Sequence, residues 1–100
     1  MPRIPAVPRS VQAAGGLVRI TTTVKPLKLE GVVCNGLYDP ERRRIRIDAS
    51  LPRAHQWKVL YHELVHVALL DAGLDNGMPD VMHEQIADAI ATARIRERWG

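Results

Sequence analysis

The chain has 100 residues, 46% of them hydrophobic, and a formal net charge of +3, which fits one small domain with a modest core. No apolar run approaches the roughly 20 residues that span a bilayer, the N-terminus lacks the apolar centre of a secretory signal, and a lone cysteine excludes an internal disulfide. We therefore expect a soluble cytoplasmic protein that has no membrane partner.

Residues 1–16 contain Pro2, Pro5 and Pro8 and end in two glycines. This composition favours a flexible or extended lead-in, so we place the boundary of the folded domain at residues 17–100. From Leu17 to Val24 the chain is rich in β-branched residues and is followed by a proline, which predicts the first strand.

Two further strands are predicted on either side of a turn. The first covers Val32 to Tyr38, Asp39 to Arg42 supply turn residues, and Arg44 to Asp48 alternate between polar and apolar side chains. We expect these two strands to form a hairpin. We interpret the arginines of this region as a solvated face or, alternatively, as a surface for an acidic protein.

A long helix should begin near Ser50, whose side chain can cap it, and end at Ala72 because Gly73 follows. Between residues 59 and 70 this helix is apolar on almost every side, which is typical of a buried element. Asp80 can cap a second helix that reaches about Arg98. The predicted fold class is α+β, with a short mixed or antiparallel sheet packed on the first helix and a C-terminal second helix.

The polar exceptions in the first helix form the motif His62-Glu63-Leu64-Val65-His66. Positions four apart lie on one helix face, so both imidazoles can bind a single metal ion. Two neutral imidazoles suit zinc, and Glu63 lies beside them as a general base for a metal-bound water. The motif predicts one Zn²⁺ per chain and hydrolysis of a peptide bond by metal-activated water.

A catalytic zinc site needs one more protein ligand, and the second helix offers His83 and Glu84. The zinc motif followed by Glu84, Ala87, Ile90 and Ala91 resembles the core of the zincin peptidases, above all the small ImmA/IrrE-like and phage-encoded members. The resemblance implies Glu84 as the third ligand. His83 is the alternative, because SprT-like zincins use a histidine on the corresponding helix.

The same resemblance implies two more features. Gluzincins often carry an aspartate four residues after the glutamate ligand, and Asp88 occupies that position as a partner that orients a liganding histidine. Residues 44–48 resemble the edge strand that pairs with an extended substrate, which implies a protein or peptide substrate. The chain lacks the downstream histidine or tyrosine with which many gluzincins stabilise an oxyanion, so Tyr38 and Tyr61 are substitutes to consider.

The resemblance covers roughly residues 32–99 and implies a zinc metallopeptidase, with endopeptidase activity expected. A second protein could then choose the substrate for so small a domain. Two alternatives stay open: a zincin-like protein-binding module with structural zinc or no turnover, and a SprT-like protease associated with nucleic acid. The intact Glu63 argues against the first, and the low aromatic content argues against the second.

Overall fold

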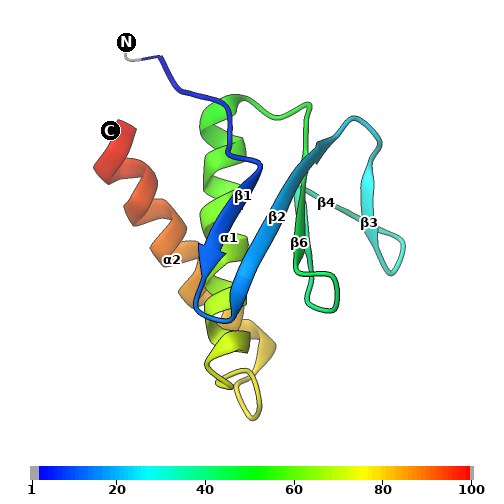
Figure 1. The fold of residues 1–100 in the computed structure, drawn as a ribbon, viewed down its shortest axis with the longest axis vertical. Helices are drawn as coiled ribbons and strands as arrows, with labels where there is room; N and C mark the ends of the chain where they lie inside the picture. The colour runs from blue at the N-terminus through cyan, green and yellow to red at the C-terminus, as the bar shows by residue number, and fades with distance from the viewer. Residues whose placement is uncertain (1–2, 100) are drawn as a thin grey trace.

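A mixed four-stranded sheet and two helices form the fold of residues 3–99, the part of the chain that the computed structural model describes (Figure 1). The sheet has the order β1-β2-β6-β5, with strands β1 (Ser10–Ala13), β2 (Gly16–Thr23), β5 (Gly36–Asp39) and β6 (Arg44–Asp48). β2 and β6 are parallel, and the other pairs are antiparallel. The predicted α+β class with a mixed sheet is confirmed.

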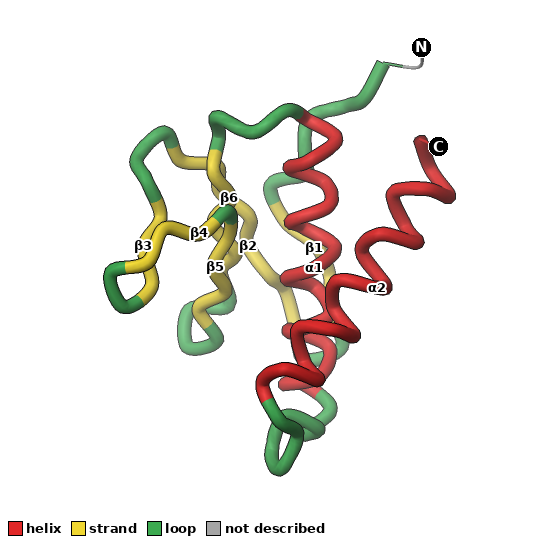
Figure 2. The backbone as a smooth tube through the Cα atoms, turned by 180° about the vertical axis from the view of Figure 1, so that it is seen from behind, coloured by secondary structure: helices red, strands yellow, loops and turns green. Residues whose placement is uncertain are grey.

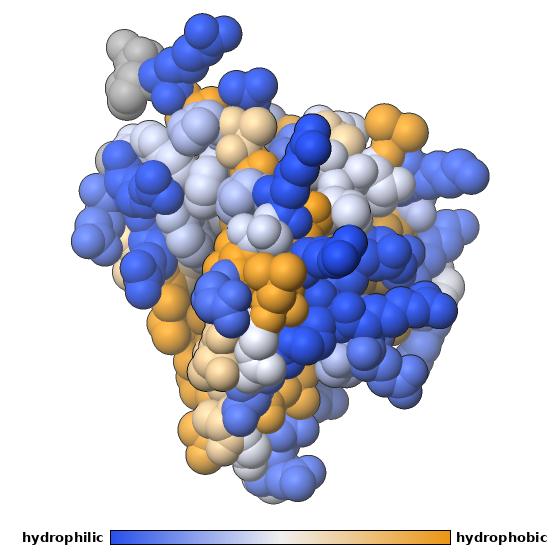
Figure 3. Space-filling view, viewed as in Figure 1, coloured by the Kyte–Doolittle hydropathy of each residue, from blue (hydrophilic) through white to orange (hydrophobic). Residues whose placement is uncertain are grey.

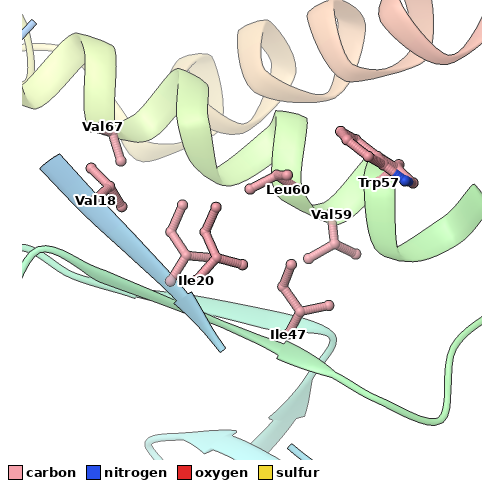
Figure 4. Packing of buried hydrophobic residues seen from close by; sticks show 8 residues of the cluster. Val18, Ile20, Ile47, Trp57, Val59, Leu60 and Val67 are labelled. Atoms are coloured by element: carbon pink, nitrogen blue, oxygen red, sulfur yellow. The ribbon is translucent and has the colours of Figure 1, made fainter. Parts of the chain in front are cut away.

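Three layers follow one another through the molecule, because α1 (Arg53–Asp71) lies between the sheet and α2 (Asp80–Trp99) (Figures 1 and 2). Alternation along β2 and β6 directs isoleucines and Val18 inward, where they meet apolar side chains of α1 (Figure 4). The buried core cluster consists of Val18, Ile20, Ile45, Ile47, Trp57, Val59, Leu60 and Val67. Hydrophilic side chains cover much of the surface on the strand side and also over the C-terminal part of α2 (Figure 3).

The predicted strand from Val32 to Tyr38 is wrong in one respect, because the structure divides it. β4 (Val32–Cys34) pairs with β3 (Leu27–Leu29) in a separate hairpin, and β5 begins at Gly36 and pairs with β6 as expected. Gly36 lies so close to α1 that an added Cβ would collide with the side chain of Val59. The break therefore lets one half of the segment approach the helix while the other half forms the outer hairpin.

The lead-in segment contains an unpredicted strand. β1 pairs with β2 through a tight turn at residues 14–15, and before it the carbonyl of Pro5 accepts a 2.8 Å hydrogen bond from Nε1 of Trp57. The backbone of Ile4 also accepts a hydrogen bond from the guanidinium of Arg53. The described part of the segment, residues 3–16, is thus extended as far as its closing turn and contacts both the sheet and the start of α1.

The predicted N-cap of α1 is wrong, whereas its predicted end at Gly73 is confirmed. Ser50 does not cap the helix, because its hydroxyl donates to Asp48 at 2.7 Å, and the N-cap position is occupied by Pro52 without a side-chain hydrogen bond. At the other end Gly73 has a φ of 71°, and the amide of Leu74 donates to the carbonyl of Leu69. A glycine in this left-handed conformation is a frequent helix stop.

One ion pair ties the C-terminal end of α1 to the turns of the sheet. The Arg43 guanidinium donates to both carboxylate oxygens of Asp71, at 2.8 and 3.0 Å, and the amide of Gly15 donates to the same carboxylate at 2.8 Å. These hydrogen bonds, first from Arg43 and then from Gly15, lower the pKa of Asp71. The contact holds α1 at a fixed position along the sheet.

Candidate metal centre

His62 and His66 lie one turn apart on α1, and the Nε2 atoms of their imidazole rings face each other. Their Nε2 atoms are 3.3 Å apart, and their side chains are 22% and 17% exposed. This is the arrangement that the four-residue spacing predicts for two ligands on one helix face. Burial is the main reason that the pKa of His66 is lowered, which favours the neutral imidazole needed by a metal ion.

Glu84 reaches the two histidines from the first turns of α2. Its Oε2 is 2.9 Å from Nε2 of His62, and its Oε1 is 3.0 Å from Nε2 of His66. The helices approach closely here because Ala87 and Ala91 are fully buried in α2, and small residues at a contact reduce the distance between helix axes. One ligand atom from each of His62, His66 and Glu84 lies within 4.8 Å of the others, so this group could hold a metal ion.

Glu63 lines the same cleft without belonging to this group of three. Its half-buried position raises the pKa of the carboxyl to about 7, mainly through desolvation and secondly through the negative charge of Glu84. A carboxyl with such a pKa can both accept and release a proton near neutral pH. Gly36 of β5 packs over this part of α1, because a Cβ there would lie 3.6 Å from Cγ of Glu63.

A cleft of about 660 Å³ runs over these residues, between α1, β5 and the β3–β4 hairpin. Its walls include residues of β5 and the hairpin on one side and one face of α1 on the other: Leu29, Cys34, Gly36, Leu37, Tyr38, His55, Lys58, His62, Glu63 and His66. The expectation that residues 44–48 form the edge strand is wrong, because β6 pairs with both β2 and β5. The edge strand beside the cleft is β5, the other strand of the predicted hairpin.

Comparison with known families identifies this arrangement. The family model for peptidase M78, described as the IrrE N-terminal-like domain, matches residues 19–96. The chain belongs to the peptidase M78 family. The match confirms the expected relation to the ImmA/IrrE-like zincins and places the chain in a family of peptidases. Searches of curated proteins and of solved structures found no match.

Within this M78 domain, His83 contacts His66 on the side of its ring that faces away from His62 and Glu84. The Nδ1 atoms of His66 and His83 are 3.3 Å apart, whereas Nε2 of His66 faces Glu84 and His62. The sequence offered Glu84 and His83 as candidates for the third ligand. Of these two, Glu84 is the residue that lies beside the Nε2 atoms of both His62 and His66. His83 is placed against the outer nitrogen of His66.

The remaining site residues of the M78 domain occupy different surroundings. Asp88 lines the cleft and is exposed, and within residues 3–99 no hydrogen bond joins it to a histidine. Tyr38 lines the cleft, while the hydroxyl of Tyr61 accepts a hydrogen bond from Arg98 and its ring packs with Trp57. His55 is exposed and lines the cleft two turns before His62.

Within residues 3–99, neither helix is long and apolar enough to cross a bilayer.

Proposed function

We propose that this M78 domain is a zinc-dependent endopeptidase in which His62, His66 and Glu84 hold one zinc ion and Glu63 moves the proton. The observation that carries the proposal is the position of a half-buried carboxyl with a pKa of about 7 beside three converging ligand atoms. Perturbed carboxyls in clefts next to such groups are typical of general acid–base catalysts.

The donor set favours zinc among divalent metals. Two imidazoles and one carboxylate are a common catalytic zinc set, which leaves one coordination position for water. Ligand atoms of a tetrahedral zinc ion lie roughly 3.3 Å apart, because each is about 2.0 to 2.1 Å from the metal. The Nε2 atoms of His62 and His66 are 3.3 Å apart, and each lies 2.9 or 3.0 Å from an oxygen of Glu84, which supports this fit.

Bound zinc would supply a water of lowered pKa and would polarise the substrate carbonyl. Glu63 accepts the proton from the attacking water and returns it to the amide nitrogen as the C–N bond breaks. In the metal-free chain, burial raises the pKa of this carboxyl to about 7, because its charged form is poorly solvated, and poor solvation of the carboxylate favours its acceptance of a proton.

A peptide is the substrate that the cleft supports best. β5 is at the edge of the sheet and lines the cleft over Glu63, so an extended peptide can add to it by backbone hydrogen bonds. A peptide paired with this strand continues on both sides of the scissile bond, which is the requirement of an endopeptidase. In such a small domain, we also propose that a second protein contributes to the choice of substrate.

The substitution Glu63→Gln tests the proposed mechanism. The variant keeps the size of the side chain and leaves all three metal ligands intact, so we expect about one bound zinc per chain and no measurable cleavage of a mixed library of unstructured peptides. A loss of at least a hundredfold in rate is expected for removal of a general base. The control is Glu97→Gln, an exposed residue near the C-terminal end of α2.

Wild-type protein is compared with and without a zinc chelator in the same assay. Cleavage that persists in Glu63→Gln contradicts the role of Glu63, and cleavage that persists after removal of the metal contradicts the role of zinc. A zinc-loaded wild-type protein that cleaves no peptide supports the alternative of a protein-binding module.

A further inference from the structure

The ring of His66 makes a second contact that the proposed proton transfer does not use. Its Nδ1 lies 3.3 Å from Nδ1 of His83, the ring planes differ by only 11°, and the ring centroids are 5.5 Å apart. The centroid separation exceeds the nitrogen separation by about two ring radii, so the rings lie edge to edge and nearly in one plane. This is hydrogen-bond geometry, because the lone pair and the N–H of an imidazole lie in its plane.

Only one of the two Nδ1 atoms can carry the hydrogen of this bond. Nε2 of His66 faces Nε2 of His62 and Oε1 of Glu84, so the lone pair that binds a metal must be on Nε2. The hydrogen of neutral His66 is then on Nδ1 and is donated to His83. His83 accepts it in its Nε2–H tautomer.

We propose that His83 is a positioning residue that fixes the tautomer and the ring orientation of His66 for metal binding. The proposal rests on the function proposed above. Ligating histidines usually donate their second N–H to a carboxylate, carbonyl or water. Here Asp88, the carboxylate expected in that role, is exposed and, within residues 3–99, has no hydrogen bond to a histidine.

Because His83 precedes Glu84 directly in α2, the contact between His83 and His66 forms together with the contact between Glu84 and His66. His83 and Glu84 are adjacent in the first turns of the helix, and the amide of His83 donates to the carbonyl of Pro79 at 3.1 Å. Fully buried Ala87 packs one turn further along the same helix. The same docking of α2 on α1 therefore brings Glu84 to Nε2 and His83 to Nδ1 of one imidazole.

Zinc affinity, measured by competition with a chromogenic chelator, tests this role. We compare the wild-type chain with His83→Ala, His83→Asn and the cleft control His55→Ala. We expect His83→Ala to bind zinc about 10 to 100 times more weakly, the usual effect of removing a partner of a ligating histidine. His83→Asn should retain most of the affinity, because its side-chain oxygen can accept the hydrogen bond near the position of Nδ1. His55→Ala should match the wild type.

Nitrogen-15 NMR of the zinc-loaded chain gives a second readout that a purely structural role would leave unchanged. We expect a protonated Nδ1 on His66 in the wild type and in His83→Asn, and rapid exchange of that proton in His83→Ala. Equal zinc affinity in His83→Ala and the wild type would overturn the proposal. Loss of all zinc in both His83 variants, as in His62→Ala, would also overturn it, because His83 would then be a ligand. A wild-type chain that binds no zinc would contradict the proposed function itself, and not only the role of His83.

Discussion

The carboxyl of Glu63 makes stability depend on pH when no metal is bound. Desolvation raises its pKa from 4.5 to about 7 in the folded chain. The folded state therefore binds more protons than the unfolded state between these pH values, so the free energy of unfolding falls as the pH rises through this window. Glu63→Gln removes this loss of stability at higher pH, because glutamine does not ionise. In the presence of a chelator we expect the variant to be more stable than the wild type at about pH 8, by on the order of 2 kcal/mol.

Urea unfolding of both metal-free proteins at about pH 5 and pH 8 measures this difference. The two stabilities should converge toward the lower pH, where Glu63 is protonated in the folded state. A constant difference at both pH values would contradict the assigned burial of the carboxyl. Glu97→Gln, which changes an exposed glutamate, should show no such pH-dependent gain.

Residue spacing within one helix was enough to predict the proximity of His62 and His66, since four residues make about one turn. The partners on α2 could not be predicted in this way. His83 and Glu84 are neighbours in sequence, and about 100° of helix rotation separates them. Which of them meets Nε2 of His66 depends on how α2 is rotated against α1, and that rotation is set by the buried Ala87 and Ala91. Family resemblance, not spacing, favoured Glu84.

The close contact between α1 and α2 rests on small side chains. Ala87 has no exposed surface, and a leucine there would have to displace α1 or distort its own rotamer. We expect Ala87→Leu to destabilise the fold by about 1 to 3 kcal/mol and to weaken zinc binding, because Glu84 moves with the helix. Thermal unfolding and chelator competition measure the two effects.

Ala89→Leu is the matched control, because Ala89 lies on the same helix and is exposed. It should leave both stability and zinc affinity near their wild-type values. Wild-type zinc affinity in Ala87→Leu would show that the position of Glu84 does not depend on this helix contact.

The sheet was less predictable than the helices. The alternation in residues 44–48 predicted a half-buried strand, and β6 has that pattern. Its central place between β2 and β5 depends on parallel pairing with a strand more than 20 residues earlier, which a local pattern does not contain. β1 has only four residues and is paired on one side, so its sequence carries little strand signal beside the prolines that precede it.

In the whole molecule, the layered arrangement puts the proposed metal centre where α2 packs on α1, beside the cleft that the sheet borders. The sheet is joined to α1 by the core and by the pair of Arg43 with Asp71. α2 packs on the opposite side of α1, and Glu84 and His83 are its contacts to the two histidines (Figure 2). A metal ion bound by both helices therefore adds its binding free energy to the stability of the entire fold.

Zinc content, measured by elemental analysis on untagged protein, tests the proposed centre most directly. The wild-type chain and the control Glu97→Ala should each carry about one zinc per chain, and Glu84→Ala should carry little or none after dialysis. A wild-type chain that takes up no zinc, or a Glu84→Ala variant that retains it fully, would contradict a metal centre built from His62, His66 and Glu84.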